Sequence, residues 1–164
     1  MYWHGSMPRD SPTRPNKIVP APVLVVLCLG GGWVGHHVHP VHVLPDLGIA
    51  APILGATLCT AALAIGLAGV REFHRHHTPT SPFKPTTALV TSGVFGRTRN
   101  PMYLGLVLLV LGVAIAVNSL AFLVAAALLG VLLQLAVIIP EERVMAAKFG
   151  DAFGAYCSRT RRWL

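Results

Sequence analysis

The chain has 164 residues, of which 54% are hydrophobic and 12% are charged, and its mean hydropathy is +0.63. This composition excludes an ordinary soluble globular protein and indicates one integral membrane domain. The formal net charge of +7 does not indicate a nucleic-acid partner, because the charges stand in blocks between apolar runs. Such blocks report the topology of a membrane protein.

The first 70 residues predict a leader and two membrane helices. Residues 1–17 are polar and rich in proline, which is typical of a disordered segment. Residues 18–35 and 47–70 are uncharged apolar runs, long enough at about 1.5 Å per residue to cross most of a membrane core about 30 Å thick. The second run is rich in Ala and Gly, which permits close helix packing in lipid. We therefore expect a two-helix membrane anchor over residues 18–70.

Two further apolar runs, residues 103–117 and 120–139, are separated by Asn118 and Ser119. Polar residues of this kind form turns that join antiparallel helices. The third and fourth helices should therefore form a hairpin. Its two arms have similar lengths, so the polar stretches at their far ends should meet at one face of the membrane.

The C-terminal region predicts an interfacial helix and the orientation of the chain. Residues 141–156 carry apolar side chains at three-and-four spacing, typical of an amphipathic helix at the interface. The terminal run SRTRRWL adds three arginines and a tryptophan, which suit an anionic headgroup layer. All thirteen Lys and Arg residues lie in the leader, in residues 71–100 or in the tail. The positive-inside rule therefore places these blocks and both termini in the cytoplasm.

The predicted fold is thus an all-α, polytopic membrane protein with about four transmembrane helices. Its chemistry should reside where Glu141 and Glu142 follow the fourth apolar run and Pro140. An ionisable group at a membrane boundary is a functional hypothesis by default. Alternatively, the two acids are ordinary first-turn residues that the helix dipole favours. Spacing alone does not separate these interpretations.

The segment that should face these acids, residues 71–100, is polar and poor in acids. Its runs TTALVTSG and GVFG offer free backbone donors and acceptors. A proline at the start of the next helix, Pro101, is ordinary in itself. A polar loop opposite two carboxylates could bind a zwitterionic ligand that resembles a nucleotide.

The runs LVTSGVFGRTRNPMYLG and EERVMAAKFGDAFGAY, joined by the hairpin, closely resemble the isoprenylcysteine carboxyl methyltransferase family. That family has the pattern Arg-His/Asn-Pro-x-Tyr-x-Gly, a hairpin, then Glu-Glu-x-x-Leu and an FG-x-x-Y tail. The related phospholipid N-methyltransferases share its general plan. The resemblance covers residues 80–162. It implies that residues 71–164 form a methyltransferase core that binds S-adenosylmethionine at the cytosolic membrane face and acts on a lipophilic acceptor.

Carried over position by position, the resemblance implies the roles of individual residues. Arg99 and Glu142 are the catalytic candidates, and Arg99 could hold the cofactor carboxylate or an anionic acceptor. The loop backbone would contact the adenine edge, an aromatic ring would pack on the ligand, and a carboxylate would pair with its ammonium group. The implied cofactor contacts are Thr87, Ala88, Leu89, Val90, Phe95, Asn100, Pro101, Met102, Tyr103 and Glu141.

Methyl transfer from a sulfonium is an in-line attack by a lone pair, so the protein mainly aligns and desolvates the reactants. By the resemblance, the acceptor is the carboxyl group of an isoprenylcysteine-like compound, which needs no general base. The alternatives are a phospholipid amine and a non-catalytic binding or scaffold protein of the same fold. A cleft between the third and fourth helices would admit the acceptor from the bilayer, and the cofactor would enter from the cytosol.

Two other polar features complete the chain. The loop with His36, His37, His39 and His42 could bind a metal, as short His-rich tracts do. It should lie on the opposite side of the membrane from the chemistry, so no metal is expected in the mechanism. Gln134, alone in the fourth apolar run, is expected to form a hydrogen bond between helices.

Overall fold

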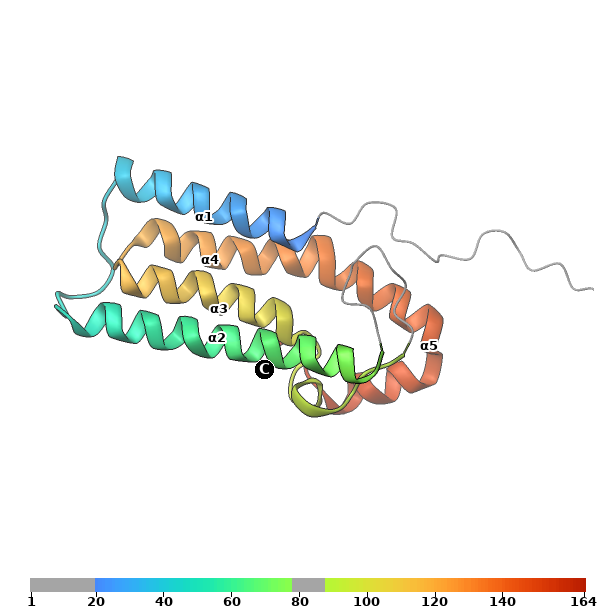
Figure 1. Ribbon diagram of the computed structural model, residues 1–164. Coiled ribbons are helices and arrows are strands. Elements are labelled where there is room, and N and C mark those ends of the chain that lie inside the picture. Colours follow the sequence, from blue (N-terminus) through green and yellow to red (C-terminus); the bar gives the residue numbers. More distant parts are fainter. Residues whose placement is uncertain (1–19, 78–87) are drawn as a thin grey trace, which may run out of the picture.

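The computed structural model describes residues 20–77 and 88–164 (Figure 1). The predicted leader and Thr87 lie outside the described residues. The named elements are all helices, which confirms the all-α prediction. They are α1 (Ala21–Val38), α2 (Ala50–Arg75), the 3-10 helix η1 (Gly93–Gly96), α3 (Pro101–Ala116), α4 (Leu120–Leu133), the π-helix η2 (Gln134–Ile138) and α5 (Ile139–Arg159).

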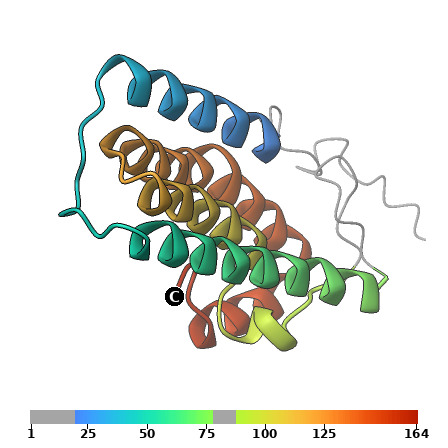
Figure 2. The ribbon, with the colours of Figure 1, turned by 60° about the vertical axis from the view of Figure 1, so that its left-hand side comes forward.

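The membrane helices lie side by side in the order α1, α4, α3, α2 (Figures 1 and 2). Helix α1 packs on α4, whereas α2 packs on α3, and α3 and α4 pack on each other. The two helices of the predicted anchor are therefore consecutive in the chain but flank the α3–α4 hairpin from opposite sides. Each of them is positioned by the hairpin.

Three helices in the described part of the chain are long and apolar enough to cross a membrane: α1, α2 and the continuous helix Leu120–Arg159. Their outward surfaces carry exposed large apolar side chains such as Val26, Leu63 and Leu128, which suit contact with lipid. Helix α3 has 16 residues and extends about 24 Å at 1.5 Å per residue. The chain is thus a helical membrane protein, and the predicted count of four crossings stays a prediction.

Small residues bring α2 and α3 together, as the composition of residues 47–70 predicts. A Cβ atom at Gly105 would lie 2.8 Å from the carbonyl oxygen of Ala62, and one at Gly112 would lie 2.5 Å from the Cys59 sulfur. Only a residue without a side chain allows two helix backbones to come this close. Such contact is a usual basis of helix packing in lipid, where the hydrophobic effect does not drive association.

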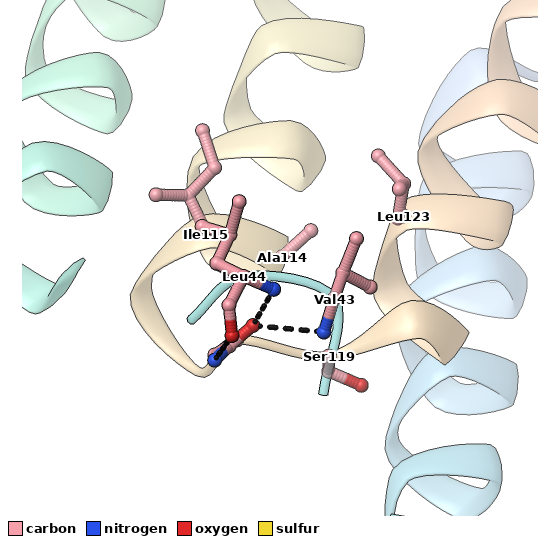
Figure 3. Close-up of a pocket in the computed structure, with 7 residues that line it drawn as sticks. Val43, Leu44, Ala114, Ile115, Ser119 and Leu123 are labelled. Carbon is pink, nitrogen blue, oxygen red and sulfur yellow. Dashed lines mark hydrogen bonds between the residues drawn. The ribbon is translucent and has the colours of Figure 1, made fainter. Parts of the chain in front are cut away.

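Asn118 closes the turn between α3 and α4 and also holds the loop that precedes α2. Figure 3 shows Val43 and Leu44 of this loop beside the turn. Its φ of +46° is a conformation that asparagine tolerates better than most residues. Its Oδ1 accepts hydrogen bonds from the backbone N–H groups of Val43 (3.0 Å) and Leu44 (2.8 Å), and its Nδ2 donates to the Leu44 carbonyl (2.9 Å). A small pocket of about 70 Å³ lies at this turn. The predicted hairpin turn is confirmed.

The fourth apolar run and the predicted amphipathic helix are not separated at Pro140, because the helix that begins at Leu120 continues through it to Phe149. The π-helix η2 lies directly before Pro140. Proline has no N–H and its ring crowds the carbonyl four residues earlier, so the wider π-turn accommodates it without ending the helix.

The chain bends instead at Gly150, whose φ of +51° and ψ of −126° are not helical. Beyond it the last part of α5 folds back across the end of the bundle (Figure 1). The buried side chains of this part, Phe153 and Tyr156, face the protein. The interfacial position of the C-terminal helix stays a prediction.

Candidate functional site

The two polar stretches that flank the hairpin meet at the end of the bundle opposite Asn118, as predicted. The Tyr103 hydroxyl, in the first turn of α3, donates a hydrogen bond of 2.8 Å to Oε1 of Glu141. Glu141 lies beyond the apolar run, which ends at Ile139. Burial raises the pKa of its carboxyl group, and the hydrogen bond from Tyr103 partly opposes this shift. The pair is therefore a carboxyl group held away from water with one fixed donor.

Glu142 forms an ionic centre beside this pair. The Arg99 Nη1 atom lies 3.1 Å from its Oε1. The Arg162 guanidinium binds the same carboxylate through Nε (3.1 Å) and Nη2 (2.6 Å), and these hydrogen bonds raise the pKa of Arg162. Glu142 is thus held between two guanidinium groups, and its predicted catalytic role stays a prediction.

Arg99 connects this centre to the end of α5. Its Nη1 also donates to the Cys157 sulfur at 2.6 Å, and its backbone N–H donates to the Arg161 carbonyl at 2.9 Å. Its Nε is buried and has no hydrogen-bond partner in residues 20–77 and 88–164. A buried donor without a partner costs free energy. Arg99 thus offers a donor to an anionic ligand.

The tail after α5 binds the loop that leads into α3. Thr98 and Arg161 form an isolated parallel β-bridge, and Asn100 Nδ2 donates to the Arg162 carbonyl at 3.0 Å. The Arg162 side chain, predicted to face lipid headgroups, instead pairs with Glu142 inside the protein. Arg159 and Arg161 are exposed and remain available for headgroups.

The end of the tail contacts the hydrophobic core of the helix bundle. Trp163 Nε1 donates to Gln134 Oε1 at 2.9 Å, and the indole packs against the core cluster around Leu133. The prediction that Gln134 joins two membrane helices is therefore wrong, because its partner lies in the C-terminal tail. The tail ties η2 to the loop at Asn100.

Phe95 anchors the loop between α2 and α3. It is only 4% exposed, and its ring stacks on the Phe73 ring of α2 with centroids 5.0 Å apart. Its carbonyl accepts a 2.7 Å hydrogen bond from the Tyr156 hydroxyl. Burial raises the pKa of Tyr156 to about 12, so this donor stays protonated at neutral pH. The packing of Phe95 on a ligand stays a prediction.

The other predicted contacts lie around these residues. Ala88 and Leu89 are half-buried, and Val90 is buried. Pro101 and Met102 lie against Gly69 of α2. The structure thus brings the start of α3 and the start of α5 into direct contact, and it places the loop of residues 88–96 on the α2 side.

Two charged residues of this region, Glu72 and Arg162, were not predicted from the sequence as parts of the site. Glu72 is buried at the end of α2, and the signal for it was the same as for Glu141, an acid directly after an apolar run. No local pattern marks Arg162 as a partner of Glu142, because that contact depends on the fold of the tail.

The histidine loop contains no metal site in the described residues, where no three His, Cys, Asp or Glu side chains are placed to hold an ion. His36 and His37 lie in the last turn of α1 instead of the predicted loop, and their rings contact aromatic rings. His37 lies 4.2 Å from Trp33, and His36 lies 6.3 Å from Phe122, measured between ring centroids.

An apolar groove of about 480 Å³ runs between α1 and α4. It is open because α1 carries Gly31, Gly32 and Gly35 on this side, and it ends near His39. It extends along α4 from Leu120 to Leu132, near the end of that helix. The lateral route predicted between α3 and α4 stays a prediction.

Fold and site together define a helical membrane protein whose polar, partly desolvated site is built from the ends of its helices. The family model described as phospholipid methyltransferase matches residues 50–152, which include α2, the site loop, the hairpin and the first part of α5. The chain belongs to the phospholipid methyltransferase family. The expected membership in this group of membrane methyltransferases is confirmed. No curated protein and no solved structure matches the chain significantly.

Proposed function

We propose that this protein transfers a methyl group from S-adenosylmethionine to a lipophilic acceptor at the membrane surface. The observation that carries the proposal is the buried Tyr103–Glu141 pair, which lies inside the region that the family matches. Methyltransferases of this family generally use S-adenosylmethionine, and an enzyme embedded in the membrane meets lipid or lipophilic substrates.

The side chains of the site fit the charges of this cofactor. S-adenosylmethionine has an ammonium group, a carboxylate and a sulfonium, and it supplies an electrophilic methyl group when bound. Glu141 would hold the ammonium, and the free Nε of Arg99 would hold the carboxylate through a charge-assisted hydrogen bond. The backbone of residues 88–90 would contact the adenine.

The chain's own contribution is alignment and exclusion of water. Tyr103 fixes the Glu141 carboxyl group through its 2.8 Å hydrogen bond, and the tail fixes Asn100 through a 3.0 Å bond. Rigid placement lowers the entropy cost of bringing two reactants together. Burial of Glu141 strengthens its attraction to a cation because the local dielectric is low.

Two acceptors remain in the proposal. The family match favours the amine of a phospholipid, and the motif resemblance favours the carboxyl group of an isoprenylcysteine-like compound. An ammonium must lose a proton before attack, whereas a carboxylate acceptor needs no base. In this proposal Glu141 and Arg99 hold the cofactor, so neither of them decides between the two acceptors.

Thermal unfolding of the detergent-purified protein with S-adenosylhomocysteine tests the cofactor site. A ligand that binds the native state adds about 2.7 kcal/mol of stability at a hundredfold excess over its Kd. We expect a dose-dependent rise in Tm that is weaker in Glu141→Ala and Tyr103→Ala. Absence of a shift at saturating ligand would reject the methyltransferase proposal and favour a non-catalytic protein of the same fold.

The acceptor is tested with methyl-labelled cofactor, supplied with either a membrane lipid extract or a prenylcysteine analogue. Mild alkali releases labelled methanol from a methyl ester but leaves an N-methyl group in place. Label that enters the lipid fraction and is not released as methanol by alkali supports phospholipid N-methylation. Alkali-labile label on the prenylcysteine analogue supports carboxyl O-methylation.

The proposed location is the cytoplasmic membrane, with both termini and the site on the cytoplasmic side. The distribution of the thirteen Lys and Arg residues supports it through the positive-inside rule. Reporter fusions that are active on only one side of the membrane test this orientation. A reporter placed in the histidine loop should report the opposite side from one placed at either terminus.

A further inference from the structure

Glu72, in the last turn of α2, is a buried acid that the proposed mechanism does not use. It is 8% exposed, and its charged partner is Arg75, whose Nη1 lies 3.7 Å from Oε2 and whose side chain is 75% exposed. A pair with one partner so exposed stabilises little. In the described part of the chain, no residue donates a hydrogen bond to this carboxylate. Its oxygens are not among the fully buried atoms that lack a partner, so they keep some contact with solvent and can accept hydrogen bonds from a ligand.

The position of Glu72 relates it to the candidate site. Its carboxylate lies directly against Gly93, where a Cβ atom would collide with it. Gly93 has a φ of +58°, so both the backbone and the space require glycine. The neighbouring Phe73 stacks on Phe95, which fixes the end of α2 against this loop.

Glu72 also lies near the start of α3. One helical turn before it, Gly69 lies against Pro101 and Met102. The carboxylate therefore lies against the loop of residues 88–96, whose first residues are proposed to contact adenine, and α2 packs against the start of α3 one turn before it. In S-adenosylmethionine the ribose joins the adenine to the sulfonium, so it would occupy the corresponding place between these two parts of the site.

We infer that Glu72 is a cofactor-binding residue that accepts hydrogen bonds from the ribose hydroxyls. This inference rests on the proposed function. A carboxylate has only acceptor atoms, and the two adjacent hydroxyls of a ribose would supply two donors where the described residues offer none. Acidic side chains bind ribose hydroxyls in this way in dinucleotide-binding folds.

The test is calorimetric titration of the full-length protein with S-adenosylhomocysteine and with its 2′-deoxy analogue. We expect Glu72→Gln to weaken binding of the full ligand about 10- to 100-fold, as for loss of a hydrogen bond to a charged group. The 2′-deoxy analogue should bind the parent about as weakly as the full ligand binds Glu72→Gln. It should lose little further affinity in the variant.

Other outcomes overturn the inference in distinguishable ways. Equal affinity of parent and Glu72→Gln for the full ligand would exclude the contact but leave the proposed function intact. An equal loss for both ligands would assign Glu72 a structural role. Absence of binding to the parent would reject the proposed function together with the inference.

Two further variants keep the test decisive. Arg75→Ala removes the exposed ion pair alone and should leave both affinities unchanged. If Glu72→Gln does not fold, Glu72→Asp withdraws the carboxylate from Gly93 while keeping its charge. It should then show the same selective loss for the full ligand.

Discussion

The two ends of the helix bundle are built on different principles. At one end a single neutral side chain, Asn118, satisfies three backbone groups of the neighbouring loop. At the other end, acids and arginines gather around Glu141 and Glu142, and the Arg99 Nε remains without a partner among the described residues. The first end is held mainly by these neutral hydrogen bonds, although the buried Ser119 Oγ has no partner there among the described residues. The second end is an ionic cluster, which we propose to bind a charged ligand.

The largest effect is expected from Glu141→Gln, which keeps the shape but removes the charge from the second end. A hydrogen bond to a charged group contributes about 1.5–3 kcal/mol, so S-adenosylhomocysteine should bind about 10- to 100-fold more weakly. Calorimetric titration measures this loss. An unchanged Kd would show that the cofactor ammonium lies elsewhere.

Asn118→Ala should destabilise the first end without changing ligand affinity at the second. The loss of three hydrogen bonds, partly replaced by water, and the strain at a positive φ should lower the free energy of unfolding by about 1–3 kcal/mol. Chemical denaturation in detergent measures this loss of stability. Asn118→Gly loses the same hydrogen bonds as Asn118→Ala but tolerates the positive φ, so it should be the less destabilised of the two. A changed ligand Kd in Asn118→Ala would contradict the independence of the two ends.

Arg162→Ala removes one guanidinium from the ionic centre and should cost about 1–2 kcal/mol, because the pair is partly exposed. Arg162→Lys should not restore the loss, since lysine cannot form the paired contact with Glu142. Arg159→Ala, which changes an exposed arginine three positions earlier, is the matched control. Equal stability of Arg162→Ala and Arg159→Ala would show that the tail is not held through this pair.

The pH dependence of ligand affinity should arise from Glu141 at the second end. Glu141 has its pKa raised above the ordinary value of 4.5, and only its ionised form attracts an ammonium group. Affinity for S-adenosylhomocysteine should therefore increase as the pH rises from about 4.5 through the shifted pKa, and Glu141→Gln should flatten this profile. In the ligand-free protein the sign reverses, because ionising a buried acid makes folding less stable over the same interval.

The smallest effect is expected from His39→Ala combined with His42→Ala at the first end. Both residues are exposed, and surface substitutions usually change stability by less than about 0.5 kcal/mol. Turnover and ligand affinity should equal those of the parent. Loss of function here, with Glu141→Gln still active, would instead favour the metal-binding hypothesis for the histidine loop.

Sequence patterns predicted those parts of the molecule that depend on neighbours in the chain. Apolar runs marked the helices, Asn118 marked the turn, and the hairpin then required Tyr103 and Glu141 to meet. The partner of α1 could not be predicted, because the apolar surfaces of membrane helices resemble one another.

The continuation of the helix through Pro140 and the docking of the tail also escaped prediction. Both depend on packing around η2, where Gln134 meets Trp163, and no local spacing encodes that contact. The candidate site was therefore predicted in its two halves, but the arginine and indole that close it from the tail were not.

The packing of α1 on α4 instead of α2 has a consequence for biosynthesis. More than 80 residues separate the end of α1 at Val38 from the start of α4 at Leu120. At about 5–20 residues per second of synthesis, α1 must remain in the bilayer for about 4–16 s before its partner exists. The bundle therefore closes from the α2 side, with its first helix added last.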